Sequence, residues 1–170
     1  DIYTRVHQQV FDQIAQLQDP VYTKGGLSLI VIEHMLRLRQ AAQHPSLFID
    51  AMGRKLKSST TTDDTSTIIS SKHNRLLQLI QATPNKPALV FFQFTAEMSI
   101  LKPLFESNGI DVFQLNGTMS LSERYNQIQQ AKEAAIKQTQ GGSPCAFFIQ
   151  IVAGGAGLNL QEFSQVFILS

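Results

Sequence analysis

Apolar residues follow two different periods along this chain, and the change of period divides the chain into two parts. Over residues 1–17 they recur every three or four positions, as on one face of a helix. Residues 18–26 break this pattern with a proline and two glycines. Residues 27–45 predict a second helix, and its first half is apolar almost all round, which indicates burial on several sides. We therefore expect a helical segment over residues 1–52.

A polar stretch separates this segment from the rest of the chain. Residues 53–71 contain the run KSSTTTDDTST, which is low in complexity and has almost no apolar surface to bury. We expect a mobile loop here, between the helical segment and a compact domain over residues 72–170.

Beyond residue 71 the apolar pattern alternates between strands and helices. Short runs rich in aromatic and β-branched residues are separated by longer segments with helical spacing, which is typical of βαβ units. Their continuous apolar character fits parallel strands buried on both faces. We therefore expect an α/β fold in which helices cover both faces of a parallel sheet. The predicted strands lie in 87–94, 110–117, 145–152 and 164–169, and the predicted helices in 70–83, 95–109 and 120–138.

Composition excludes several classes of protein. The chain has 170 residues and a net charge of +1, so no strongly basic surface argues for nucleic-acid binding by itself. A single cysteine, Cys145, excludes a disulfide framework and a cysteine-rich zinc site, and the four histidines lack metal-ligand spacing. No apolar run approaches the ~20 residues that a membrane span needs. We expect no metal site and no membrane partner.

A glycine-rich loop is the strongest candidate for chemistry. Gly154, Gly155 and Gly157 follow the strand predicted over residues 145–152. Ligands of open α/β sheets bind at the carboxyl ends of the strands, and glycines let backbone N–H groups approach an anion closely. The alternative is that these glycines only make a tight turn.

Spacing excludes two common phosphate loops. The sequence contains no G-x-x-x-x-G-K-[ST] motif, so it has no Walker A loop. Gly155 and Gly157 begin a G-x-G-x-x-G pattern, but Leu160 occupies the third glycine position. A nicotinamide-dependent enzyme is therefore a weak alternative.

A set of ordered motifs resembles another family. The loop AGGAGLNL, starting at Ala153, closely resembles motif V of the DNA translocases of the sucrose-non-fermenting type, the chromatin-remodelling ATPases and their relatives. LRLRQAAQHP, SSKHNRLLQLI, ALVFFQF and LNGTMSLSER are similar to further blocks of that family, in the same order. All of them belong to the second RecA-like lobe of these motors.

The resemblance implies a role for the lobe and a set of site residues. The intact motor would bind ATP and Mg²⁺ between two lobes and would move along double-stranded DNA. This chain would be a cut through lobe two, ahead of the arginine-rich motif VI, so that alone it would bind no cofactor and catalyse nothing. Its partners would be the N-terminal RecA-like lobe and the DNA backbone, which is read without sequence preference. The implied nucleotide-side residues are Gly154, Gly155, Gly157 and Asn159, and the implied DNA-side residues are Gln93, Gly117, Thr118, Arg124 and Gln150.

Other readings stay open at several positions. Gly117 and Thr118 also fit an ordinary turn before a helix, and Arg124 also fits an ion pair with an acid on its own helix. Gln150 begins a run, Gln-Ile-Val, where the family usually has hydroxyl residues. This departure favours an alternative, a non-catalytic interaction module, and a strand-separating helicase is another. A nuclear location is expected for a eukaryotic source, and the cytoplasm or a viral replication site otherwise.

Overall fold

The structure, a computed structural model, divides the chain into two compact units, Asp1–Ser70 and Ser71–Ser170. We describe each unit by itself. The residues described are 4, 8, 12, 24–44, 46–47, 70–154 and 157–169, with side chains from residue 31 onward in the helix that begins at residue 24.

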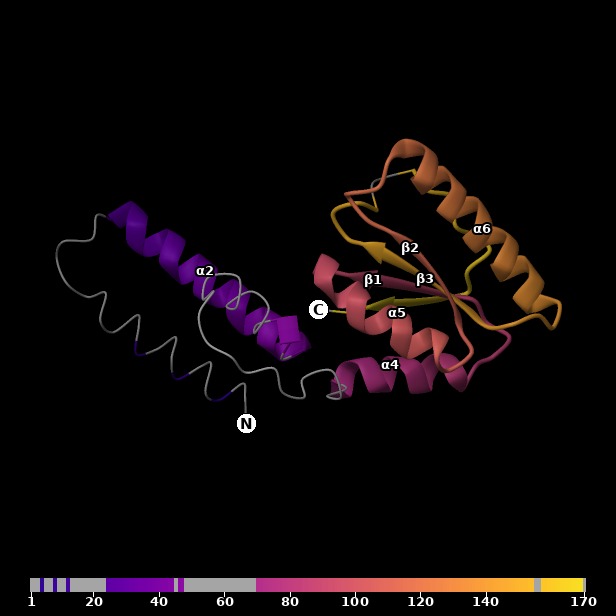
Figure 1. Cartoon of the computed structure of the whole chain (residues 1–170), viewed down its shortest axis with the longest axis horizontal. Coiled ribbons are helices and arrows are strands. Elements are labelled where there is room, and N and C mark those ends of the chain that lie inside the picture. The colour runs from indigo at the N-terminus through magenta and orange to yellow at the C-terminus, as the bar shows by residue number, and fades with distance from the viewer. Residues whose placement is uncertain are drawn as a thin grey trace. The chain divides into compact units, whose positions relative to one another are not determined.

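The first unit contains one long described helix, α2 (Lys24–Gln43; Figure 1). It begins ahead of the predicted start, so Gly25 and Gly26 lie within the helix and the predicted break at these glycines is wrong. Burial on several sides is also wrong for part of α2, because Ile32 is 59% and Met35 is 60% exposed. An apolar helix gains free energy when another surface covers it, but the composition of the helix does not show that such a surface is present.

The predicted first helix and polar loop lie mostly outside the described residues. Thr4, Gln8 and Asp12 are helical, and Gln8 Nε2 donates to Asp12 Oδ1 over 3.0 Å, as neighbours one helical turn apart do. The loop expected over residues 53–71 is described only at Ser70 and Ser71, so its expected mobility stays a prediction.

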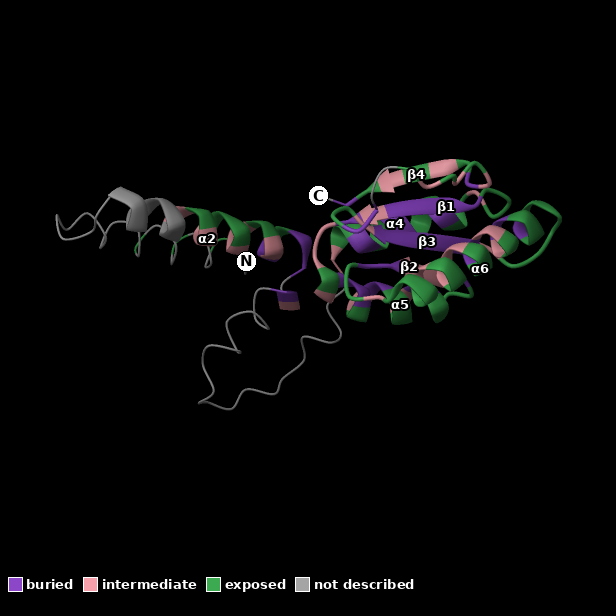
Figure 2. Ribbon diagram, turned by 90° about the horizontal axis from the view of Figure 1, so that it is seen from above, coloured by how far each residue is buried: buried purple, intermediate pink, exposed green. Residues whose placement is uncertain are grey.

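The second unit is built around a four-stranded parallel sheet with the strand order β2-β3-β1-β4 (Figure 2). This arrangement confirms the predicted α/β fold. Strand β3 lies between β1 and β2, so the chain crosses over β3 on its way from β1 to β2. The elements are α4 (Ser71–Gln81), β1 (Ala88–Phe92), the short 3-10 helix η2 (Thr95–Glu97), α5 (Met98–Glu106), β2 (Asp111–Leu115), α6 (Leu121–Thr139), β3 (Cys145–Gln150) and β4 (Gln165–Ile168).

Two apolar clusters, one on each face of the sheet, form the core. Alternate side chains of a strand point to opposite faces, so Phe148 of β3 joins α4 and α5 on one face and Phe147 joins α6 on the other. Helices therefore cover both faces, as predicted. Burial is nearly complete along the central strands β1 and β3, whereas the edge strand β4 alternates between partly buried and exposed residues (Figure 2).

Helix α6 begins with a capping box, formed by the Ser-x-x-Glu spacing of Ser120 and Glu123. Ser120 Oγ accepts the backbone N–H of Glu123 over 3.3 Å, and the Glu123 carboxylate accepts the Ser120 N–H over 2.8 Å. Two backbone donors of the first turn are satisfied in this way, which fixes where α6 begins. The turn over residues 116–119 therefore runs between two fixed points, the end of β2 and the start of α6.

We expect Phe148→Ala to destabilise the second unit strongly. The Phe148 ring is fully buried and meets Phe105 edge to face, with 5.2 Å between ring centroids. Removing it leaves a cavity as well as losing transfer free energy, so the free energy of unfolding should fall by about 3–5 kcal/mol. Urea denaturation measures this change. Leu121→Ala is the control, because Leu121 is 86% exposed, and a loss as large as that of Phe148→Ala would contradict the assigned core.

Candidate functional site at the carboxyl ends of the strands

The carboxyl ends of β1, β2 and β3 meet at one edge of the sheet. Parallel pairing aligns Phe92 of β1 with Gln150 of β3, and Leu115 of β2 with Ile149 of β3. Of the residues expected to meet DNA, Gln93 follows β1, Gly117 and Thr118 follow β2, Gln150 ends β3 and Arg124 lies in α6. The loop after β3 carries the residues expected to border a nucleotide. The parallel register therefore gathers both sets along a single edge.

Gln150 joins the turns after β1 and β2 through its side-chain amide. Its Oε1 atom accepts the backbone N–H of Gly117, after β2, over 3.1 Å. Its Nε2 atom donates to the Thr95 hydroxyl, after β1, over 3.1 Å. The Gln150 side chain thus links β1 and β2 across the end of the strand that separates them.

In the turn after β2, the N–H groups of Gly117 and Thr118 both donate to acceptors within the protein. The Gly117 N–H is held by Gln150, and the Thr118 N–H donates to Asn116 Oδ1 over 3.1 Å. The Thr118 hydroxyl donates to the same oxygen over 2.8 Å, and Asn116 is buried. The Asn116 contact is a local turn, in which an asparagine side chain accepts the N–H two residues further on. The Gln150 contact comes from a strand distant in the sequence, so only the fold reveals it.

The loop after β3 turns back on the strand that precedes it. The N–H groups of Ala153 and Gly154 both donate to the Gln150 carbonyl, over 2.8 and 2.9 Å. Gly154 is buried, and a Cβ atom at this position would lie 3.0 Å from Ile149 Cγ2. Close packing therefore favours glycine here, and the Gly154 N–H is already engaged by the protein. Gly155 lies outside the described residues.

The remaining nucleotide-side residues are accessible. Gly157 is exposed with φ of +100°, a backbone conformation that residues with a side chain rarely adopt, and Asn159 is exposed beside it. Leu158 and Leu160 pack on the α6 face of the sheet instead. Gly157 and Asn159 thus have room to border a nucleotide, and their predicted role remains a prediction.

Two cations of α6 hold this loop. Arg124 donates from its guanidinium to the Ala153 carbonyl over 2.5 Å, instead of pairing with an acid on its own helix. Further along α6, Lys132 forms an ion pair of 3.1 Å with Glu162, which follows the glycine-rich stretch. Arg124 thus lies beside the expected DNA edge, but its guanidinium already has a partner in the protein.

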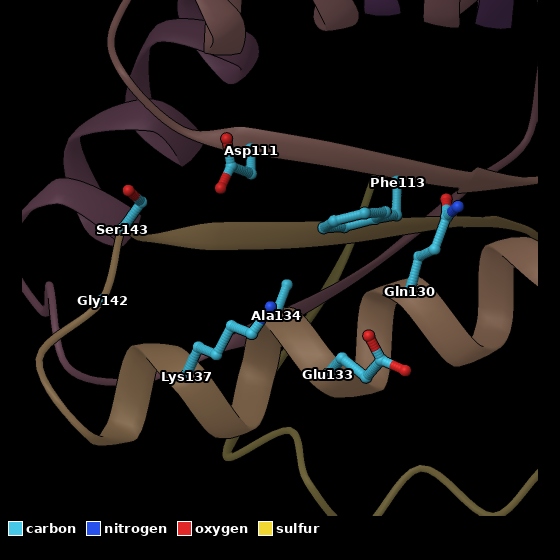
Figure 3. Close-up of a pocket in the computed structure, with 8 residues that line it drawn as sticks. All are labelled: Asp111, Phe113, Gln130, Glu133, Ala134, Lys137, Gly142 and Ser143. Atoms are coloured by element: carbon cyan, nitrogen blue, oxygen red, sulfur yellow. The ribbon is translucent and has the colours of Figure 1, made fainter.

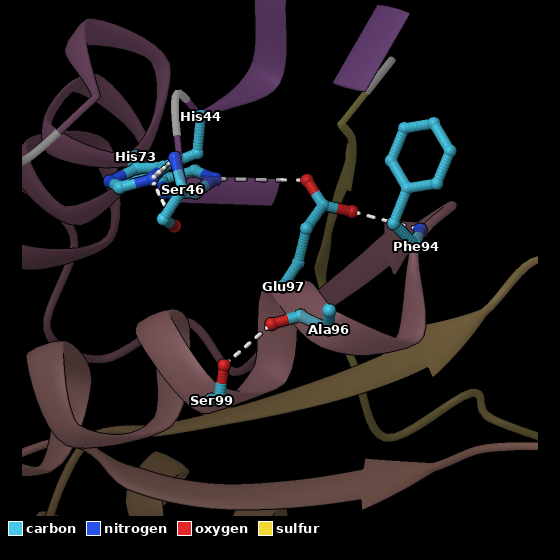
Figure 4. Close-up of polar contacts among 7 residues, drawn as sticks. All are labelled: His44, Ser46, His73, Phe94, Ala96, Glu97 and Ser99. Carbon is cyan, nitrogen blue, oxygen red and sulfur yellow. Dashed lines mark hydrogen bonds and ion pairs between the residues drawn. The ribbon is translucent and has the colours of Figure 1, made fainter. Parts of the chain in front are cut away.

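A buried carboxylate shapes the turn after β1. Glu97 accepts the Phe94 N–H over 3.0 Å, and its other oxygen lies 3.7 Å from His73 Nε2 (Figure 4). Both side chains are fully buried. This arrangement closes the turn that carries Gln93 and presents Thr95 to Gln150. Gln93 itself is half-buried, so the structure leaves its expected contact with DNA as a prediction.

A shallow groove of about 500 Å³ lies away from this edge (Figure 3). It runs between β2 and α6 and includes Asp111, the first residue of β2, and Ser143, which precedes β3. It therefore belongs to the amino ends of the strands and contains none of the residues that the sequence singled out.

Sequence reasoning missed three groups of the site: the Thr95 hydroxyl, the Asn116 amide and the Ala153 carbonyl. A signal for the first two was available, because each follows the end of a predicted strand closely, where parallel strands place polar groups at one edge. The third is a backbone atom and has no sequence signal. Among the described residues, no group of His, Cys, Asp or Glu could hold a metal, and no helix has the length and apolar character needed to cross a bilayer.

Comparisons with known proteins agree with this architecture. The family profile for the helicase conserved C-terminal domain matches residues 71–170. A C-terminal domain of the SWI2/SNF2 ATPase of Sulfolobus solfataricus superposes with a TM-score of 0.68 at 18% identity, covering 98% of this chain and 65% of that chain. This likeness shows a shared fold.

Similar sequences occur in a helicase-like transcription factor and in a DNA repair protein. The human helicase-like transcription factor is 33% identical over 104 residues, which cover 59% of this chain and 10% of that protein. The DNA repair protein RAD5 of Cryptococcus neoformans is 31% identical over 105 residues, covering 62% of this chain and 8% of that protein. The matched region thus spans about a tenth of the length of these relatives.

We expect Gly157→Ala to cost more stability than Gly117→Ala. A Cβ atom at Gly157 meets nothing within 4 Å, so the cost of about 1–3 kcal/mol comes from the positive φ alone. At Gly117 a Cβ atom would lie 3.8 Å from Gln150 Oε1, an ordinary contact, and its φ lies outside the left-handed range. Urea denaturation compares the two variants, and equal stability losses would contradict the loop geometry.

The capping box predicts a lowered pKa for the Glu123 carboxyl. Hydrogen bonds from the Ser120 hydroxyl and N–H to the charged carboxylate lower the pKa of Glu123 from 4.5. The capping box therefore stabilises the folded state above the ordinary pKa of a glutamate, and this contribution is lost as the pH falls through the lowered pKa of Glu123. Carbon NMR titration should place the Glu123 midpoint below 4.5, and Ser120→Ala should raise it. Ser107→Ala, at the end of α5, should leave that midpoint unchanged, and an unchanged midpoint in Ser120→Ala would contradict the assignment.

Proposed function

The chain belongs to the family of helicase conserved C-terminal domains, and we propose that it forms the second motor lobe of an ATP-dependent double-stranded-DNA translocase. The observation that carries the proposal is the edge where β1, β2 and β3 end. There the Gln150 side chain bonds to the turns expected to contact the DNA backbone. Its carbonyl accepts N–H groups of the loop expected to border a nucleotide. A motor needs such a connection, because a change at one ligand must alter the grip on the other.

The chain's own groups would position ligands rather than perform chemistry. Gly157 and Asn159 would border ATP and Mg²⁺, which in the complete motor lie between this lobe and an N-terminal RecA-like lobe. Catalysis of phosphoryl transfer depends on positioning and on stabilisation of the transferring charge, and this sequence lacks the phosphate-loop motif for it. The chain alone is therefore proposed to hydrolyse no ATP.

The DNA would be held by its backbone. The proposed contacts are the turn at Gly117 and Thr118, with Arg124 and Gln93 near the same edge. Contacts of such groups with phosphates carry no sequence information, which favours binding without sequence preference. Opening and closing of two lobes would shift such contacts along the duplex. Relatives named as a transcription factor and a DNA repair protein support a nuclear role in a eukaryotic cell.

A second candidate function, a non-catalytic interaction module, is favoured by one observation. Ile151 and Val152 are 44% and 81% exposed at the edge where the family usually has hydroxyl residues. Exposed apolar side chains beside a ligand edge suit a protein partner better than a phosphate backbone. Replacing both by threonine should strengthen DNA binding if the edge faces DNA, and should leave it unchanged if the edge faces a protein.

We expect weak DNA binding with a shallow dependence on salt. Arg124 is the one cation among the proposed contacts, and each neutralised phosphate contributes about 0.9 to the slope of log affinity against log salt. The slope should be about one, and the dissociation constant no tighter than about 1 μM at physiological salt. Fluorescence anisotropy with two labelled duplexes of unrelated sequence measures both quantities.

Two variants sharpen this measurement. Arg124→Gln should flatten the slope, whereas Lys102→Gln, which removes an exposed cation paired with Glu106 on α5, should leave it unchanged. Equal effects of the two variants, nanomolar affinity or discrimination between the duplexes would contradict the proposed backbone grip.

A further inference from the structure

One polar contact of this edge joins a backbone donor to a side chain of the protein itself. The Gly117 N–H is the backbone donor expected to meet a DNA phosphate, and Gln150 Oε1 accepts it over 3.1 Å. A carbonyl oxygen and a phosphate oxygen are both acceptors that approach an N–H along the same direction. The Gln150 amide oxygen therefore occupies the place that a phosphate oxygen would take.

The two acceptors compete for the same hydrogen. A backbone N–H carries one hydrogen, and sharing it between two acceptors lengthens and weakens both bonds. Gln150 is half-buried at the last residue of β3, so its side chain is partly accessible to solvent. Its second anchor is the Thr95 hydroxyl, 3.1 Å from Nε2.

We propose that Gln150 is a latch, which holds the Gly117 N–H closed in the free lobe and must release it before this turn can bind a DNA phosphate. This inference rests on the proposed DNA-binding function and gives Gln150 a role different from that of a direct DNA contact. The Thr95 hydroxyl is the second anchor of the latch. Because the same amide bonds to both, release of the Gly117 N–H after β2 also affects the bond to the turn after β1.

The latch also reaches the glycine-rich loop. The Gln150 carbonyl accepts the N–H groups of Ala153 and Gly154, at the start of the glycine-rich loop. The side chain of the same residue holds the Gly117 N–H in the turn after β2. Movement of the Gln150 side chain toward or away from Gly117 therefore takes place at the first residue of the nucleotide-side loop. Phosphate binding at Gly117 and the position of this loop are coupled through Gln150.

Gln150→Met separates a latch from a direct contact by the sign of its effect. Methionine has a similar length but neither the amide oxygen nor the amide N–H, so it frees the Gly117 N–H and cannot donate to a phosphate. A latch predicts tighter binding of a labelled 20-base-pair duplex, by about fivefold, the scale of one hydrogen bond. A direct contact predicts weaker binding. Thr95→Val removes only the second anchor, and a latch predicts a smaller increase in affinity.

Amide exchange reports on the latch without DNA. Hydrogen–deuterium exchange followed by NMR should be about fivefold faster at the Gly117 amide in Gln150→Met than in the unchanged chain, because the hydrogen bond that protects it is lost. The Thr118 amide, bonded to Asn116, should keep its exchange rate in both proteins. This comparison shows whether the variant has opened one bond or loosened the whole turn.

Gln140→Met is the matched control, because Gln140 is exposed at the opposite end of α6 and lies outside the proposed site. It should change neither DNA affinity nor exchange at Gly117. Faster exchange at Gly117 together with tighter DNA binding in Gln150→Met supports the latch. Unchanged or weaker binding in that variant, while the unchanged chain binds DNA, overturns the latch and leaves the proposed function standing. Absence of DNA binding by every protein overturns both.

Discussion

The parallel pairing of β3 with both β1 and β2 is the constraint on which the site depends. Because β3 is the middle strand of the three, its last residue lies between the turns that follow its neighbours, although Thr95, Gly117 and Gln150 are far apart in the sequence. Hydrogen bonding along the strands sets the register, and Phe147 and Phe148, fully buried on opposite faces of β3, hold the strand in the core. The position of every polar group at the edge follows from this register.

The polar groups at this edge are satisfied by one another. Gln150 engages the Gly117 N–H, Asn116 engages Thr118, and Arg124 engages the Ala153 carbonyl. Gly117 and Thr95 are exposed, so water is an alternative partner for these groups and each internal bond contributes only about 0.5–1.5 kcal/mol. A ligand that binds here has to exchange such an internal bond for its own, which links recognition to a rearrangement of side chains.

Helix α6 connects this edge to the loop after β3. Its capping box fixes the first turn beside Thr118, and its cations Arg124 and Lys132 contact the loop near Ala153 and at Glu162. The same helix also covers one face of the sheet, where Phe147 is buried. The loop is therefore attached to an element that packing holds in place, and glycines do not by themselves decide its path.

The sequence by itself determined the alternation of strands and helices, the parallel sheet and the capping box at Ser120, because apolar periodicity and local hydrogen bonding depend on neighbours in the chain. It also placed Gly117, Gln150 and the glycine-rich loop at strand ends, and so on one edge. Only the tertiary structure decided that Gln150 holds Gly117 and Thr95, that Arg124 holds a backbone carbonyl, and that Ile32 and Met35 of α2 are exposed. The partners of side chains and the surfaces that cover helices come from segments distant in the sequence, and no local pattern encodes which of them meet.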